Sequence, residues 1–75
     1  MITPGSYLSE WLKNNNITIS EASEKFGIDD TTMRRLLEDK ISFRGYSTRS
    51  EKLTNIPREH WLKLQEEYEK NKNDN

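Results

Sequence analysis

The stretch TISEASEKFGIDDTTMRRLLEDK, residues 18–40, holds two short amphipathic patterns on either side of a single glycine. Before the glycine, Ala22 and Phe26 lie four positions apart, which places them on one face of a helix. After it, Met33 and Leu36 lie three positions apart and share a face in the same way. Two helices joined by a turn at a glycine form a helix-turn-helix, and the stretch predicts that unit.

The signals for helix ends agree with this pattern. Thr18 and Glu21 have the spacing of a capping box, so the first helix of the unit is expected to begin directly after Thr18. Gly27 is expected to end it, because glycine adopts a positive φ at little cost. Asp29 then caps the next helix, which is predicted over residues 30–39.

Further helices are predicted on both sides of the unit. Thr3 can cap a helix and Pro4 suits its first position, so a helix is expected over residues 4–14. Residues 46–53 have a thin apolar face and are predicted to form a short helix. Pro57 opens a last helix. The sequence therefore predicts an all-α fold with five helices.

The helices are expected to form one helix-turn-helix domain over residues 1–69. Residues 70–75 have no apolar side chain and are predicted to form a flexible C-terminal tail. The chain has 75 residues, of which 31% are hydrophobic, so its core is thin. A homodimer that buries additional surface is therefore expected.

Composition argues against several classes of protein. The chain has no cysteine, which excludes disulfides and thiolate metal sites. His60 is its one histidine, and without clustered carboxylates it makes neither a zinc site nor a catalytic triad. We therefore expect no enzymatic activity, no cofactor and no metal. No apolar run approaches the roughly 18 residues of a membrane span and the N-terminus does not resemble a signal peptide, so a cytoplasmic location away from the membrane is expected.

Charge is distributed unevenly along the chain, whose net charge is −1. Residues 31–52 carry six basic and three acidic side chains, whereas the segments before and after them are acidic on balance. A local basic patch can bind phosphate even when the total charge is negative. A solvated surface that happens to be basic explains the same distribution equally well.

Three segments carry a resemblance to a known family. Residues 17–40 resemble the helix-turn-helix of the Cro and phage-repressor family, with the small Ser23 four positions before Gly27 in the turn. Residues 3–8, TPGSYL, look like the TPGE-x-L opening of HigA-type antitoxins. Residues 51–65, EKLTNIPREHWLKLQ, are similar to the closing pattern of those antitoxins, E-K-x-T-G-I-P-x-E-F-W-L-N-L-Q. Together the matches span nearly the whole chain.

The resemblance implies a five-helix bundle of the repressor-like helix-turn-helix type. It also implies a homodimer that binds a double-stranded DNA operator with its third helix in the major groove. Members of the family repress their own operon, and many neutralise a toxin protein that cleaves mRNA on the ribosome. The expected function is therefore a sequence-specific, autoregulatory transcription regulator of the antitoxin or phage-repressor kind, with a cognate toxin as a further candidate partner.

By position, the resemblance implies DNA contacts on the third helix and beside it. Threonine hydroxyls contact base edges or phosphate, and arginine reads guanine with two hydrogen bonds. Basic residues after the helix suit phosphate contacts, as does the N-terminus of the preceding helix. The expected DNA-binding residues are Thr18, Ser20, Asp30, Thr31, Thr32, Arg34, Arg35, Lys40 and Arg44.

Other features favour an alternative, in which the scaffold binds a toxin or another regulator with weak or no DNA binding. Ile19 occupies a place where family members often carry glutamine, and Asp30 would repel phosphate. In the last helix, Trp61, Leu64 and Tyr68 share one face. That face could serve as a dimer or partner surface, although the same spacing is typical of core residues.

Overall fold

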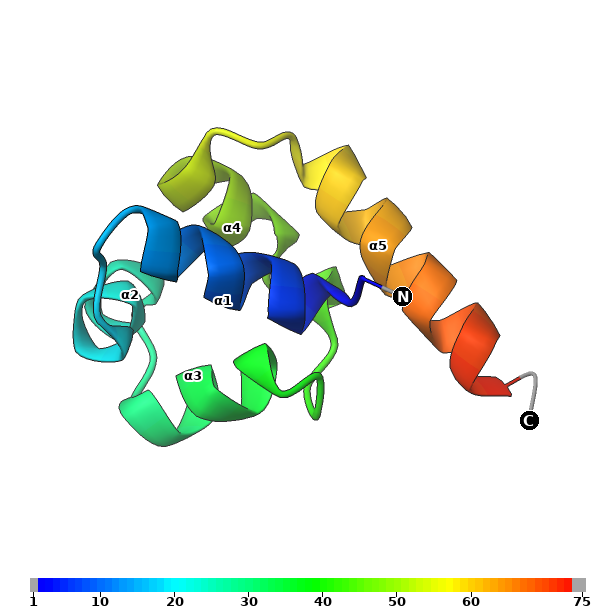
Figure 1. Ribbon diagram of the computed structural model, residues 1–75, viewed down its shortest axis with the longest axis horizontal. Helices are drawn as coiled ribbons and strands as arrows, with labels where there is room; N and C mark the ends of the chain where they lie inside the picture. Colours follow the sequence, from blue (N-terminus) through cyan, green and yellow to red (C-terminus); the bar gives the residue numbers. More distant parts are fainter. Residues whose placement is uncertain (1, 74–75) are drawn as a thin grey trace.

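The computed structural model describes residues 2–73 of the chain (Figure 1). Within this range the structure is entirely helical, with no strand. Its elements are α1 (Pro4–Asn14), α2 (Ile19–Phe26), α3 (Asp30–Leu37), the 3₁₀ helix η1 (Phe43–Gly45), α4 (Ser47–Thr54) and α5 (Arg58–Asn73). The predicted all-α fold with five α-helices is confirmed. None of these helices combines the length and the apolar character that a membrane crossing requires.

Helices α2 and α3 begin where the local sequence predicts, and α3 ends at Leu37, two residues before the predicted end. At α2, the Glu21 N–H donates to Thr18 Oγ1 at 3.1 Å, and the Thr18 N–H donates to Glu21 Oε1 at 2.9 Å. Gly27 ends α2 with a φ of 72°. At α3, the Thr32 N–H donates to Asp29 Oδ1 at 2.7 Å. These bonds satisfy backbone donors that the first turn of each helix leaves unpaired.

The core fills the space where α1 and α3 meet α5 and η1. Trp61 of α5 lies at its centre, with no exposed surface. Its ring stacks on Phe43 at a centroid distance of 5.6 Å, and Tyr7 packs edge-on against it at 5.4 Å. The buried apolar side chains are Leu8, Leu12, Ala22, Phe26, Met33, Leu36, Phe43 and Trp61. The expectation that Trp61 contributes to a dimer or partner surface is therefore wrong for this structure.

The N-terminal end of α1 packs directly on the C-terminal end of α3. The Gly5 N–H donates to Asp39 Oδ1 at 2.8 Å, and Gly5 is buried. A Cβ atom on Gly5 would lie 2.4 Å from the carbonyl oxygen of Leu37, so only glycine fits this contact. The arrangement is electrostatically favourable, because the positive end of one helix dipole meets the negative end of the other. Nothing in the sequence pattern marks this contact.

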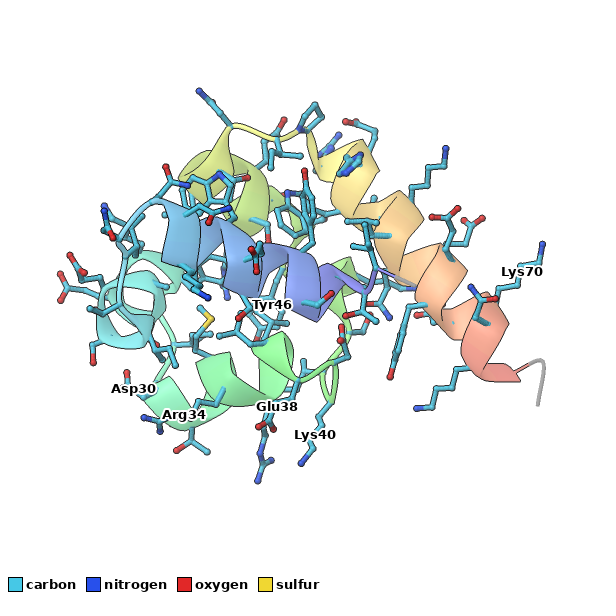
Figure 2. The ribbon with its side chains drawn as sticks, viewed as in Figure 1. Asp30, Arg34, Glu38, Lys40, Tyr46 and Lys70 are labelled. Atoms are coloured by element: carbon cyan, nitrogen blue, oxygen red, sulfur yellow. The ribbon has the colours of Figure 1, made fainter. Side chains whose placement is uncertain are left out.

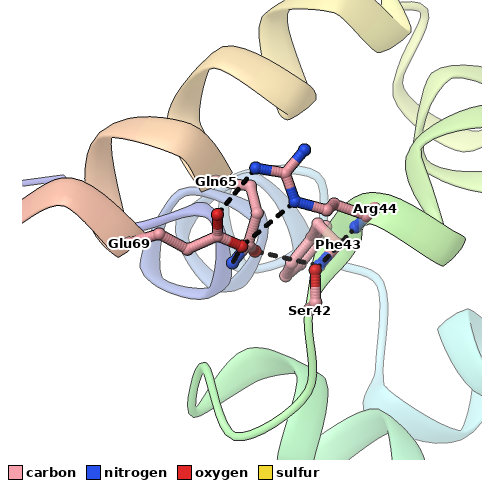
Figure 3. A network of polar contacts seen from close by, with 5 residues as sticks. All are labelled: Ser42, Phe43, Arg44, Gln65 and Glu69. Carbon is pink, nitrogen blue, oxygen red and sulfur yellow. Dashed lines mark hydrogen bonds and ion pairs between the residues drawn. The ribbon is translucent and has the colours of Figure 1, made fainter. Parts of the chain in front are cut away.

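A chain of hydrogen bonds ties η1 to α5 (Figure 3). The buried Phe43 N–H donates to Gln65 Oε1 at 2.9 Å, and Gln65 Nε2 donates to Glu69 Oε2 at 3.0 Å. Arg44 completes the chain with two bonds to the Glu69 carboxylate, at 2.6 and 3.2 Å. Gln65 is only 4% exposed, and the bond from Phe43 satisfies its amide oxygen inside the fold.

The last helix extends into the segment 70–75, for which a flexible tail was the expectation. It continues to Asn73, and the Asn71 side-chain amide donates to the Glu67 carbonyl at 2.9 Å. Lysines in the last turn stabilise a helix end by interacting with its dipole. The expected tail is therefore helical as far as Asn73, and residues 74–75 lie outside the described residues.

Hydrogen bonds lower the pKa of three carboxylates that support the fold. They lower the pKa of Glu21 through Thr18, that of Asp29 through Thr32, and that of Glu69 through Arg44 and Gln65. A carboxylate whose pKa is lower in the folded state binds fewer protons there than in the unfolded chain near pH 4. Its stabilising effect is complete above the ordinary pKa and is lost as the pH falls through the lowered value.

We therefore predict that the melting temperature falls when the pH drops from above the ordinary glutamate pKa of 4.5 towards about 2. The change to test is Glu69→Gln, which removes one of the three linked groups and should make this fall shallower. Thermal unfolding followed by circular dichroism across this pH range measures both proteins. A melting temperature of the unaltered protein that does not change over the range would contradict the prediction.

Candidate nucleic-acid interface

Helix α3 divides cleanly into a buried and an exposed side. Met33 and Leu36 have no exposed surface and face the core. Figure 2 shows side chains of the opposite side, including those of Asp30 and Arg34, projecting away from the body of the molecule. The exposed candidates on α3 are Thr31, Arg34 and Arg35, and the half-buried ones are Asp30 and Thr32. The structure therefore places five of the expected DNA-binding residues on one helix, and both arginines are exposed.

The basic side chains along α3 differ in how they are paired. Lys40 Nζ lies 3.5 Å from Glu38 Oε1, and both side chains are largely exposed. Such an exposed pair contributes at most about 1 kcal/mol, so Lys40 can exchange this partner for a phosphate. Over residues 2–73, no ion pair involves Arg34 or Arg35. These two guanidinium groups are therefore available to a ligand.

The N-termini of α2 and α3 are joined by a hydrogen bond between two expected contact residues. Ser20 Oγ donates to Asp30 Oδ2 at 3.0 Å, so the hydroxyl proton of Ser20 already has an acceptor. The Thr18 hydroxyl oxygen accepts the cap bond from the Glu21 N–H, and a hydrogen bond from the Thr18 side chain also helps to lower the pKa of Glu21. A hydroxyl proton at a helix N-terminus can be donated to a phosphate oxygen. A phosphate contact by either hydroxyl would therefore compete with a carboxylate, Glu21 for Thr18 and Asp30 for Ser20.

Arg44 does not join this surface. Its side chain points to α5, where Nη2 and Nε bond both oxygens of Glu69 (Figure 3). The bond to Glu69 raises the pKa of Arg44, as expected for a cation that faces a carboxylate. The expected phosphate contact by Arg44 would require this two-bond pair to break. In this geometry Arg44 ties η1 to α5.

The remaining residues singled out from the sequence occupy the edges of the core. Ile19 is half-buried and packs against the core cluster, so its aliphatic side chain supports α2 from the inside. Leu64 and Tyr68 are also half-buried, and Leu64 contacts the core cluster. Because Trp61 is buried, only Leu64 and Tyr68 of the three residues expected to form a partner surface on α5 are partly exposed.

Arg49 and Lys52 form part of a basic surface that no motif marked in advance. Both side chains are exposed on α4, beside the C-terminal end of α2. Their spacing of three places them on one helix face, a signal that the sequence does contain. They belong to the segment with excess positive charge, but α4 carries them away from the exposed side of α3.

The structure brings together few groups that could support other chemistry. Within residues 2–73, no cluster of three or more histidine, cysteine, aspartate or glutamate side chains has the arrangement to hold a metal ion. No family model matches the sequence, and no curated protein or solved structure is significantly similar to it. The surfaces of the molecule therefore carry the functional argument.

Proposed function

We propose that the chain is a sequence-specific DNA-binding transcription regulator of the repressor-like helix-turn-helix type. The observation that supports this most is the exposed side of α3, where Arg34 and Arg35 form no ion pair with any of the described residues. An α-helix fits the major groove of B-DNA, and arginine reads guanine through two parallel hydrogen bonds. A rigid helix with two available arginines has the shape and the chemistry that this readout requires.

In this mode, Arg34, Arg35 and Thr31 face base edges while neighbouring groups hold the phosphate backbone. Lys40 follows α3 in the chain, and the Thr18 hydroxyl stands at the N-terminus of α2. Contacts to phosphate set the register of the helix in the groove without reading sequence. As a homodimer, the protein would place two copies of α3 about 34 Å apart on one face of the duplex.

The resemblance of both chain ends to HigA-type antitoxins supports a narrower form of the proposal. In that form the protein is cytoplasmic, represses its own operon and binds a cognate toxin. Two observations argue against strong DNA binding. The carboxylates of Asp30 and Glu38 project on the same side of the molecule as Arg34, and Arg44 is paired with Glu69. These observations favour the alternative, a scaffold that acts chiefly by binding a protein partner. The two functions differ in whether α3 contacts DNA.

We predict that the Arg34→Ala/Arg35→Ala double variant loses binding to a duplex that carries the protein's own upstream region. Each arginine that reads guanine contributes about 1–3 kcal/mol, so affinity should fall by at least about thirtyfold. The unaltered protein should also bind much more weakly as salt rises, because phosphate contacts release counterions. Fluorescence anisotropy of the labelled duplex at several salt concentrations measures both effects.

The matched control is the Lys63→Ala/Lys70→Ala double variant, which removes the same charge from exposed positions on α5. It should bind DNA nearly as well as the unaltered protein. Circular dichroism should show equal helicity in all three proteins. If the folded, unaltered protein does not bind this duplex at low salt, the proposal fails. An equal loss in the α5 variant would show that binding depends on total charge and not on α3.

A further inference from the structure

A groove of about 700 Å³ lies between the C-terminal end of α2 and the face of α4. Its apolar wall consists of Ile17, Phe26 and Leu53, of which Ile17 and Leu53 are half-buried. In Figure 1, α4 lies on the other side of α1 from α3. The groove is therefore distinct from the exposed side of α3, and the inference drawn from it holds whether or not α3 binds DNA.

The rim of the groove is basic. Lys25, Arg49 and Lys52 are exposed there, against the single carboxylate of Glu24. Over residues 2–73, none of the three cations takes part in an ion pair. The guanidinium carbon of Arg49 lies 5.2 Å from the centroid of the Tyr46 ring, which helps to hold the side chain in place. A ligand that complements this rim carries negative charge.

Backbone acceptors in the same wall restrict the kind of anion that fits. Lys25 and Phe26 end α2, and among the described residues no hydrogen bond reaches their carbonyl oxygens. These carbonyls carry the negative end of the helix dipole and can accept hydrogen bonds from water or from the N–H groups of a ligand. A DNA backbone offers phosphates but no N–H or O–H donors, and it would leave the apolar wall uncovered. A peptide supplies carboxylates, N–H groups and apolar side chains together.

We propose that the groove binds an acidic, amphipathic peptide segment of a partner protein. An apolar side chain of the segment covers Ile17 and Leu53, and its carboxylates face Lys25, Arg49 and Lys52. Its N–H groups donate to the end of α2. Binding combines burial of apolar area with charge pairs at a solvated rim. The charge pairs affect specificity and the rate of association more than affinity.

The test uses a synthetic peptide with leucines at helical spacing and glutamates at the remaining positions. A second peptide with lysine in place of glutamate is its matched control. In amide NMR spectra of the full chain, the glutamate peptide should shift the signals of Gly27, Arg49, Lys52 and Leu53. The lysine peptide should not shift them. No shift at these residues at saturating glutamate peptide would overturn the proposal, as would equal shifts with both peptides.

Variants then separate this site from α3. Arg49→Glu/Lys52→Glu should weaken binding of the glutamate peptide by at least about tenfold, since each cation becomes a repelling charge. Lys52→Glu alone keeps the contact of Arg49 with the Tyr46 ring and should weaken peptide binding less than the double variant does. This single variant therefore tests the charge of the rim even if the double variant folds poorly. Arg34→Ala/Arg35→Ala should bind the peptide normally. Duplex DNA that shifts the same groove signals and displaces the peptide would identify a phosphate site and overturn the proposal.

Discussion

Replacement of Trp61 by alanine is expected to remove a large part of the free energy of unfolding of this domain. Trp61 is the largest side chain without exposed surface, and it packs between Phe43 and Tyr7. Loss of such a side chain costs about 3–5 kcal/mol, because the cavity it leaves does not collapse fully. A domain of this size has about 4–11 kcal/mol in total. Urea unfolding followed by circular dichroism measures the loss.

Two variants test whether this cost comes from burial. Trp11→Ala makes the same chemical change at a half-buried position and should cost clearly less. Trp61→Phe keeps an aromatic ring in the core and removes the indole N–H, which has no hydrogen-bond partner among the described residues. Because an unpaired buried donor is itself unfavourable, this variant should be much milder than Trp61→Ala. Equal losses for Trp61→Ala and Trp11→Ala would contradict the assignment of Trp61 to the core.

Gly5→Ala is expected to destabilise the domain by about 3 kcal/mol, the upper end of the usual cost of inserting one carbon into a packed site. The new Cβ would lie 2.4 Å from the Leu37 carbonyl oxygen and 2.8 Å from Asp39 Oδ1. The first of these atoms belongs to the backbone and cannot rotate away. Helices α1 and α3 must therefore separate, which also weakens the hydrogen bond from the Gly5 N–H to Asp39.

Gly45→Ala is the matched control for this prediction. A Cβ at Gly45 meets no atom within 4 Å, and the residue does not have a positive φ. Its free energy of unfolding should therefore change by no more than about 0.5 kcal/mol. Urea unfolding of both variants gives the comparison. If the two alanine substitutions have similar effects, the contact between α1 and α3 is not as tight as the structure shows.

The beginnings of α2 and α3 and the turn between them could be predicted from the sequence because the residues that determine them are close together in the chain. The capping bonds of Thr18 with Glu21 and of Asp29 with the Thr32 N–H each join residues three apart. Gly27 has a positive φ and directly follows the last residue of α2, so its effect on the helix end is local as well. Residue identity and spacing are enough to determine such features, since every partner lies within one helical turn.

The contacts that hold the helices together could not be predicted in the same way. Gly5 and Asp39 are 34 positions apart, and Phe43 and Gln65 are 22 positions apart. Neither pair has a spacing that distinguishes it from many others in the chain. Which glycine must remain a glycine, and whether Gln65 is buried, depend on how closely two helices approach.

The candidate site shows the same division. The sequence alone determined that α3 has a polar side with adjacent arginines, because helical periodicity separates Arg34 and Arg35 from Met33 and Leu36. Only the tertiary structure decided that Arg44 pairs with Glu69. It also decided that Trp61 belongs to the core, because periodicity identifies an apolar face but not what covers it. Charge and hydrophobicity belong to a residue, whereas burial and pairing arise only when distant segments pack together.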